Sequence, residues 1–419
     1  MTIEMSGILR RSIQAIARAS QEGTAERRGA CCLLYALCAM LAVLSWQAAT
    51  VQFNYGGNWT ALFMTGEFHP PPPQLAGHTY VFKASTGYDG QFYRYVAHAP
   101  WYRADWARYY DSPRLRNERI LAPALAWLLA AGQDQYVDGA YIALFLCWVW
   151  LGTYWLGRYA ADEGRHPAWG LAFLLLPATL TSIDRMTVDV AMAALSVAFV
   201  RYAKKESSAR LYLVLVLAVL VRETGALLIA GLCWYDLAGR RWRRAAGFAT
   251  AILPAAAWYA YIWNRTAALA AAHPEKHPHH ASFWRLQSPG AGMLMKLFQP
   301  DQYPFSPWLN HGLQVADALA LCGFATLIAM AVWSLRQRPW DVEQWAMLGF
   351  VALALATSPA DFWGQVYNYG RPFTPLVFLA ALRPWRNRSP WAFAPVLPIT
   401  LRVLAQMAPQ AAGIARGLW

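Results

Sequence analysis

The sequence predicts an all-α polytopic membrane protein, a bundle of about 10 to 12 transmembrane or re-entrant helices with a long first external loop. Its 419 residues are 57% hydrophobic and only 14% charged. Apolar runs of about 17 to 24 residues recur along the chain, and a helix of this length crosses roughly 30 Å of hydrocarbon. We therefore expect a cytoplasmic segment, 1–29, followed by a single transmembrane domain, 30–419.

The formal net charge of +13 comes largely from Lys and Arg at the ends of apolar runs. Because cytoplasmic loops of membrane proteins carry this excess, the charge indicates contact with membrane lipid and not with nucleic acid. The first apolar run, 30–51, follows a basic segment and lacks a small-residue cleavage site, so we expect a retained helix with a cytoplasmic N-terminus. The six cysteines lie in apolar runs, without disulfide or zinc spacing.

The first helix leads into the first external loop, 52–118. Later apolar runs predict helices over 119–131, 139–157, 167–183, 188–203, 211–235, 245–263, 312–334, 342–358, 372–383 and 390–408. Basic clusters place the loops near 201–210, 240–244, 336–338 and 383–388 in the cytoplasm. A second long external loop is expected over 264–311.

Two runs do not fit simple alternation across the membrane. The run 211–235 has basic loops on both sides and contains Arg222 and Glu223, each of which would cost about 2.5 to 3.5 kcal/mol at the bilayer centre. A broken, re-entrant hairpin with these two residues at its tip resolves both problems, since irregular backbone is tolerated where it lines a cavity. The run 119–131 is short for a span and is interpreted as another half-helix.

The first external loop contains an acidic, aromatic-rich motif with the sequence YDGQFYRY, residues 88–95. Tyr88, Phe92 and Tyr95 have helical spacing, which predicts a short surface helix with these rings buried and Asp89 facing a cavity. Gly90 lets a substrate or another backbone segment approach closely. The alternative interpretation is an interfacial aromatic belt with a helix-capping Asp.

Three arginines next to membrane segments are candidates for binding phosphate. Arg116 and Arg119 lie where the chain re-enters the membrane, and the guanidinium fork suits a phosphate group. Arg371 follows an aromatic segment that leads into a late helix. For all three, anchoring at the membrane interface is the alternative role.

Charged residues also interrupt apolar runs further along the chain. Asp184, Arg185 and Asp189 separate two runs, and either helix capping or a functional site explains them. Arg222 and Glu223 are functional candidates because ionisable residues within membrane segments usually have a role, and a buried ion pair is the alternative. The His-rich segment 273–280 matches no familiar metal site and is interpreted as a loop. No phosphate-binding loop, dinucleotide fingerprint or Gly-x-Ser-x-Gly motif occurs.

Four ordered segments, YDGQFYRYVAHAP, RNERILAPALAWLLAAG, SIDRMTVDVAMAAL and LAVLVRETGALLIA, are similar to bacterial polytopic proteins implicated in cell-surface glycopolymer formation. These proteins in turn resemble GT-C glycosyltransferases, including mannosyltransferases with an aromatic-Asp-Gly pattern in the first external loop. The resemblance covers 88–235 and, through the pattern around Arg371, extends to the last third. It implies a GT-C-like bundle in the bacterial inner membrane, with its active face on the periplasmic side.

The same resemblance implies an inverting transfer from a polyprenyl-phosphate sugar donor to a glycan or lipid acceptor, with Asp89 at the position of the base. The chain departs from the family where His98 precedes Ala99-Pro100 and where Asn117-Glu118 precedes Arg119. These departures leave open a second acidic or metal-binding group in the loop. A divalent metal is therefore one possible cofactor, and no residue is assigned as its ligand.

Chemical reasoning from the residues agrees with this resemblance. A sugar hydroxyl needs a general base, for which Asp89 is the candidate, and a leaving phosphate needs fixed cations. We expect Arg119, Arg222 and Arg371 to bind phosphate and Asp184, Asp189 and Glu223 to shape the pocket. Further substrate-binding candidates are Tyr88, Gln91, Tyr93, Arg116 and Arg185. The alternative functions are a lipid-linked glycan flippase or transporter, with charges spread through the membrane depth, and a glycan polymerase or ligase that relies on 264–311.

Overall fold

The computed structural model describes residues 2–205, 207–272 and 289–419, so the His-rich segment 273–280 lies outside the described residues. Within these ranges, four helical segments are long and apolar enough to cross a membrane. They are Glu26–Asn54 of α1 (Thr2–Asn54), α6 (Asp134–Asp162), Trp242–Ala272 and α14 (Pro307–Ser334). The third combines α11 (Trp242–Ala249), η5 (Thr250–Ile252) and α12 (Leu253–Ala272). The protein is thus an all-α membrane protein, as predicted from the sequence.

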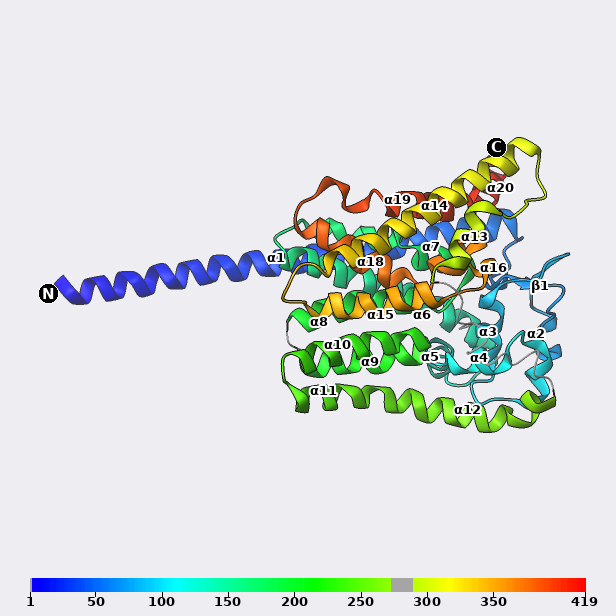
Figure 1. Cartoon of the computed structure of the whole chain (residues 1–419), viewed down its shortest axis with the longest axis horizontal. Coiled ribbons are helices and arrows are strands. Elements are labelled where there is room, and N and C mark those ends of the chain that lie inside the picture. Colours follow the sequence, from blue (N-terminus) through cyan, green and yellow to red (C-terminus); the bar gives the residue numbers. More distant parts are fainter. Residues whose placement is uncertain (1, 206, 273–288) are drawn as a thin grey trace.

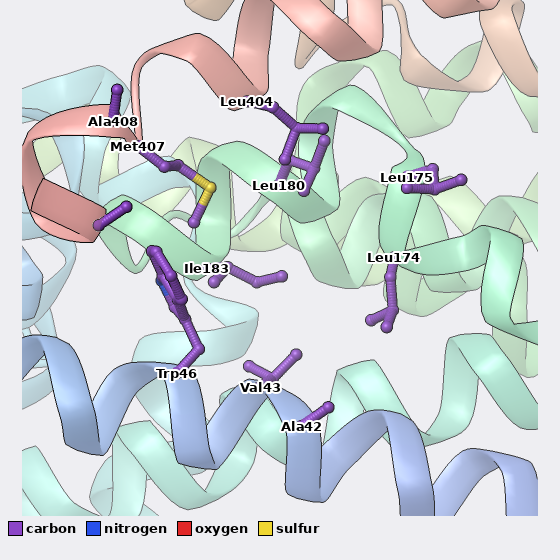
Figure 2. Close-up of a pocket in the computed structure, with 11 residues that line it drawn as sticks. Ala42, Val43, Trp46, Leu174, Leu175, Leu180, Ile183, Leu404, Met407 and Ala408 are labelled. Carbon is purple, nitrogen blue, oxygen red and sulfur yellow. The ribbon is translucent and has the colours of Figure 1, made fainter. Parts of the chain in front are cut away.

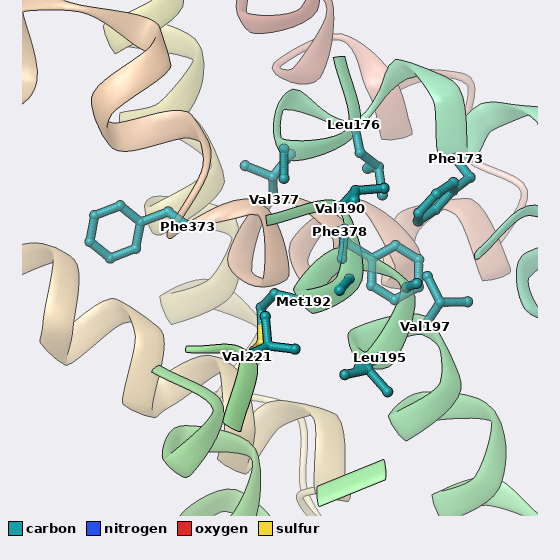
Figure 3. Packing of buried hydrophobic residues seen from close by; sticks show 14 of the residues in the cluster. Phe173, Leu176, Val190, Met192, Leu195, Val197, Val221, Phe373, Val377 and Phe378 are labelled. Atoms are coloured by element: carbon teal, nitrogen blue, oxygen red, sulfur yellow. The ribbon is translucent and has the colours of Figure 1, made fainter. Parts of the chain in front are cut away.

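Shorter helices complete the bundle (Figure 1), namely α8 (Asp189–Lys204), α9 (Ser208–Val221), α10 (Ala226–Ala238), α15 (Val342–Ala356), α18 (Thr374–Arg386), α19 (Val396–Ala405) and α20 (Ala408–Leu418). Helix α8 is predominantly apolar and is buried over nearly its whole length, as expected of a helix at the centre of a bundle. Figure 3 shows its side chains among those of neighbouring segments, including Phe173, Val221 and Phe378. The core therefore fixes the position of Asp189, the first residue of α8.

Two runs that were predicted as single helices are divided by prolines. The run 167–183 forms η3 (Pro167–Leu175) and then α7 (Pro177–Arg185), because Pro177 has no N–H to donate and forces Leu176 into an extended conformation. The run 390–408 likewise forms η8 (Pro390–Phe393) before α19 begins. Both predictions of one continuous helix were wrong, and Pro177 accounts for the break in the first run.

The run 211–235 is broken as predicted, with Arg222 in an extended conformation between α9 and the short turn η4 (Glu223–Gly225). Helices α9 and α10 then lie side by side (Figure 1). A Cβ atom on Gly225 would lie 2.4 Å from the carbonyl of Ala218, so the tight turn requires glycine. At about 1.5 Å per residue, the 14 and 13 residues of α9 and α10 are shorter than the hydrocarbon layer. Helix α5 (Leu121–Leu129) is shorter still, in agreement with the predicted half-helix.

The segment 52–118, which was predicted to be the first external loop, has its own local structure. It contains η1 (Trp59–Phe63), α2 (Pro73–Ala76), α3 (Asp89–His98), η2 (Ala104–Tyr109) and α4 (Pro113–Glu118), together with β1 (Thr65–Gly66) and β2 (Val81–Phe82). The two strands pair in parallel, Thr65 with Val81 and Gly66 with Phe82. In α3, Phe92 and Tyr95 are buried, as their helical spacing predicted, whereas Tyr88 precedes the helix and is only half-buried.

Short loop helices and basic loops lie at opposite ends of the bundle. Helices α3, α4, α13 (Ala291–Phe298) and α16 (Ala360–Gly364) lie at the end opposite the projecting N-terminus of α1, whereas α8 and α11 meet their basic loops near the N-terminal end (Figure 1). There, Lys205 binds Asp162 at 2.9 Å and Arg383 binds Asp341 at 3.2 Å. This separation agrees with the predicted charge pattern. The assignment of the basic end to the cytoplasm stays a prediction.

Candidate functional site

The position of Asp89 is set by the close packing of the start of α3. Asp89 is the first residue of the helix, and Tyr88 before it is extended. A Cβ atom on Gly90 would lie 2.2 Å from the carbonyl oxygen of Arg185 and 3.0 Å from that of Phe63. Glycine at position 90 therefore lets α3 rest directly on the ends of α7 and η1. The sequence predicted a close approach here, and the approaching group is backbone.

Asp89 is held between two arginines from distant parts of the chain. Its Oδ1 accepts a hydrogen bond from Arg116 Nη2 at 2.8 Å, and its Oδ2 accepts one from Arg371 Nη1 at 2.7 Å. Burial alone would raise the pKa of Asp89, but the two guanidiniums outweigh burial and hold the pKa well below its usual range. The carboxylate is therefore ionised, and its oxygens face other segments and not the backbone of its own helix.

From Arg371 the ion pairs continue toward the broken helix. Arg371 Nη1 lies 3.3 Å from Asp189 Oδ2, and the other oxygen of Asp189 accepts a hydrogen bond from Arg222. Arg222 Nε lies 3.8 Å from Glu223 Oε1. Asp189 is fully buried, so its charge depends on these two arginines.

The contacts return to α3 through Arg119 and Tyr93. Arg119 binds Glu223 with two hydrogen bonds, Nε to Oε2 at 3.0 Å and Nη2 to Oε1 at 2.7 Å. The Tyr93 hydroxyl accepts hydrogen bonds from Arg119 at 2.8 Å and from Arg116 at 3.3 Å. The contacts thus close on themselves. We call this set the arginine–carboxylate ring, made of Asp89, Tyr93, Arg116, Arg119, Asp189, Arg222, Glu223 and Arg371.

The charges of the ring are balanced once Asp111 is included. Asp111 accepts two hydrogen bonds from Arg116, at 2.9 and 2.6 Å. The side chains of Asp111 and Glu223 are 35% and 33% exposed, whereas that of Asp189 is inaccessible. The ring is therefore buried at the start of α8, whereas Glu223 and the neighbouring Asp111 are partly exposed.

A second cluster lies beside the ring and contains the predicted residues Asp184 and Arg185. Asp184 Oδ2 accepts hydrogen bonds from Arg185 Nε at 3.0 Å and from the Tyr367 hydroxyl at 3.2 Å. Its Oδ1 accepts one from Gln410 Nε2 at 2.7 Å. The Arg185 guanidinium is 4.5 Å from the ring centroids of both Tyr88 and Tyr367. Two aromatic faces thus fix its position.

Tyr88 joins the second cluster to the arginine–carboxylate ring. Arg371 lies 4.7 Å from the Tyr88 ring centroid, so this aromatic ring contacts Arg185 as well as Arg371. The Tyr88 hydroxyl donates to the carbonyl of Tyr367 at 3.3 Å. All of the predicted cations, Arg116, Arg119, Arg185, Arg222 and Arg371, therefore belong to one connected region around Asp89.

Gln91 differs from the other predicted substrate-binding residues in its surroundings. It is fully buried, its Oε1 accepts from the Gly66 amide at 3.1 Å, and its Nε2 donates to the Thr86 carbonyl at 3.0 Å. Gln91 therefore ties the preceding loop to α3. Tyr93 is also fully buried, and it contacts Arg116 through both its hydroxyl and its aromatic ring.

Three residues of this region were not found from the sequence. Asp111 precedes Arg116 by five residues, and that spacing was its only local signal. Tyr367 lies in α17 (Val366–Gly370), within the aromatic segment that ends at Arg371. Gln410 lies in α20 and carried no signal in the sequence. Within the described residues, no group of His, Cys, Asp and Glu side chains is arranged to hold a metal ion.

The fold and this region together define a helical membrane protein with a dense cluster of paired charges at one end of its bundle. No protein-family model matches the chain, and neither a curated protein nor a solved structure matches it.

Proposed function

We propose that this chain is a membrane glycosyltransferase of GT-C type. It moves a sugar from a polyprenyl-phosphate donor to a cell-surface glycan or lipid acceptor on the external side of the bacterial inner membrane. The observation that carries the proposal is Asp89, a carboxylate at one end of a membrane-spanning bundle that is bonded to Arg116 and Arg371. This arrangement offers a base and fixed cations within one small region.

The chemistry of sugar transfer makes use of both kinds of group. An acceptor hydroxyl must lose its proton as it attacks the sugar, and a carboxylate within hydrogen-bond reach takes that proton. The bond from the sugar to the donor phosphate breaks, and negative charge grows on the phosphate oxygen. Guanidiniums already in place stabilise this charge without reorganisation. The side chain of Asp89 is 17% exposed, which leaves one edge for an acceptor hydroxyl.

The bonds within the ring suggest how an anionic donor activates the base. Asp89 is a weak base while two guanidiniums bind it, since they lower its pKa. A donor phosphate competes with Asp89 for Arg371 or Arg116. Each arginine has a second carboxylate, Asp189 and Asp111 respectively, and therefore stays charged and in place during the exchange. As a guanidinium leaves Asp89, the pKa of the carboxyl group rises and its strength as a base increases.

The same bonds revise the roles expected of Arg119 and Arg222. Arg119 holds Glu223 with two hydrogen bonds, and Arg222 holds the buried Asp189. Displacing Asp189 from Arg222 would leave a fully buried carboxylate with Arg371 as its remaining cation, which is costly, and displacing Glu223 from Arg119 would break two hydrogen bonds. We therefore assign Arg119 and Arg222 to positioning Tyr93 and Asp189, and Arg371 and Arg116 to contact with the phosphate.

The direct test is sugar transfer by the purified full-length chain in lipid nanodiscs. A panel of radiolabelled polyprenyl-phosphate sugars serves as donors, and a cell-envelope fraction serves as the acceptor. We expect label in the acceptor with one donor and loss of that transfer in the Asp89→Asn variant. Movement of the lipid-linked sugar between leaflets, without transfer from any donor, would instead support the flippase alternative. Cysteine labelling near positions 89, 185 and 222 from each side of the membrane then shows whether these positions share one face.

A further inference from the structure

An apolar groove runs along the bundle between α1, the η3–α7 segment and the α19–α20 segment (Figure 2). Its volume is about 370 Å³. Each side chain that lines it is apolar, and the lining consists of Ala42, Val43, Trp46, Leu174, Leu175, Leu180, Ile183, Leu404, Met407, Ala408 and Ala411. A groove of this composition within a membrane bundle suits a hydrocarbon chain.

One end of the groove meets the Asp184–Arg185 pair. Leu180 and Ile183 line the groove, and α7 ends two residues later at Arg185. On the other wall, Ala411 follows Gln410, which donates to Asp184 at 2.7 Å. Both walls of the groove thus lead to the same polar pair, and that pair adjoins the start of α3 through the contact between Gly90 and the Arg185 carbonyl.

Arg185 differs from the four arginines of the ring in what its guanidinium binds. Its Nε donates to Asp184 at 3.0 Å, and Tyr88 and Tyr367 flank its plane. Within the described part of the chain, its two terminal nitrogens have no hydrogen-bonding partner, whereas each ring arginine binds a carboxylate through a terminal nitrogen. The side chain of Arg185 is 19% exposed. Its terminal nitrogens are therefore available to an anionic group at the end of the groove.

We propose that the groove binds the hydrocarbon chain of the polyprenyl-phosphate donor and that the terminal nitrogens of Arg185 bind its phosphate, in addition to the phosphate contact assigned above to Arg371. This inference rests on the proposed glycosyl transfer and adds the location of the donor. A single groove suits a lipid with one chain, whereas a diacyl phospholipid carries two. The phosphate then lies near Tyr88, whose ring also contacts Arg371, so the sugar attached to it is presented to Asp89.

The test measures binding of a long-chain polyprenyl phosphate to the full-length chain in nanodiscs, without acceptor and without transfer. Ala411→Trp fills the groove from an exposed position, and Ala412→Trp is its matched control, since Ala412 is also exposed on α20 but does not line the groove. We expect Ala411→Trp and Arg185→Gln each to weaken binding at least about tenfold. The Ala412→Trp variant should bind as the unaltered chain does. Thermal unfolding of each variant reports whether it is folded.

Three results would overturn the inference. Equal affinity in Ala411→Trp and Ala412→Trp excludes the groove, and full affinity in Arg185→Gln excludes the phosphate contact. Equally effective competition by phosphatidylglycerol identifies a site for ordinary phospholipid and excludes a donor site. The proposed function can fail independently of this inference. If donor binding depends on Ala411 and Arg185 but no sugar is transferred, the groove is supported and glycosyl transfer is contradicted.

Discussion

Replacing Asp89 with asparagine removes one negative charge and keeps the shape of the side chain, so it tests the general base with little change in packing. After the substitution, Arg116 keeps its two hydrogen bonds to Asp111, at 2.9 and 2.6 Å. Arg371 keeps Asp189 at 3.3 Å and the Tyr367 carbonyl at 2.6 Å. Neither guanidinium is left without a partner.

These remaining contacts limit the expected loss in the free energy of unfolding, whereas the expected loss in transfer rate follows from the missing base. Breaking an isolated buried ion pair costs about 3 to 5 kcal/mol, but here we expect a loss in the free energy of unfolding of only about 1 to 2 kcal/mol. Loss of a general base lowers the rate of transfer by about 10² to 10⁴. The Asp89→Asn chain should therefore fold in normal yield and transfer sugar at least about a hundredfold more slowly.

The assay is the initial rate of sugar transfer, with the melting temperature measured on the same preparations. Asp111→Asn is the matched control, because Asp111 binds the same Arg116 and does not contact Arg371. We expect it to slow transfer by less than about tenfold, since it removes a partner of the cation and leaves the base. Equal losses of transfer rate in both variants would mean that Asp89 acts only through the charge of Arg116. Full transfer activity in Asp89→Asn would refute the role of Asp89 as base.

Three further predictions concern pH, packing and pairing. Burial opposes ionisation of Asp89, but Arg116 and Arg371 lower the pKa of its carboxyl group in the folded protein below the usual value of about 3.9. The ionised carboxylate therefore contributes its full stabilisation of the fold above that pH. This contribution is lost only as the pH falls toward the pKa of the folded state. The difference in melting temperature between the unaltered chain and Asp89→Asn should thus stay constant from about pH 5 to 8 and shrink below about pH 4, and a change within the neutral range would contradict this. Gly90→Ala places a Cβ atom 2.2 Å from the Arg185 carbonyl and should cost about 1 to 3 kcal/mol in thermal unfolding, while Gly77→Ala, with nothing within 4 Å, should cost nothing measurable. A double-mutant cycle of Arg119→Gln and Glu223→Gln should give a coupling energy of about 1 to 3 kcal/mol in unfolding, and additive effects would show that the pair is not formed.

Several features of the fold could be predicted from local sequence. Apolar runs of spanning length predict membrane helices, because crossing a bilayer depends mainly on the length and composition of one segment. The helix break at Arg222 was predicted for a similar reason, since charges cannot lie unpaired within hydrocarbon. Pro177 was also visible in the sequence. The helix break it causes was nevertheless missed, because the apolar run continues through it.

The sequence by itself determined that this is a helical membrane protein, that charged residues interrupt its apolar runs, and that the segment 88–95 contains a short helix with buried aromatic rings. Only the tertiary structure decided which charges pair. Asp89 meets Arg371 across 282 residues and Arg119 meets Glu223 across 104, and neither distance along the chain carries a local signal. Hydropathy and helical spacing depend on neighbours in sequence, whereas the partner of a charge depends on how separate helices pack. That packing joins four of the candidate cations to three carboxylates in one closed ring that includes Asp89.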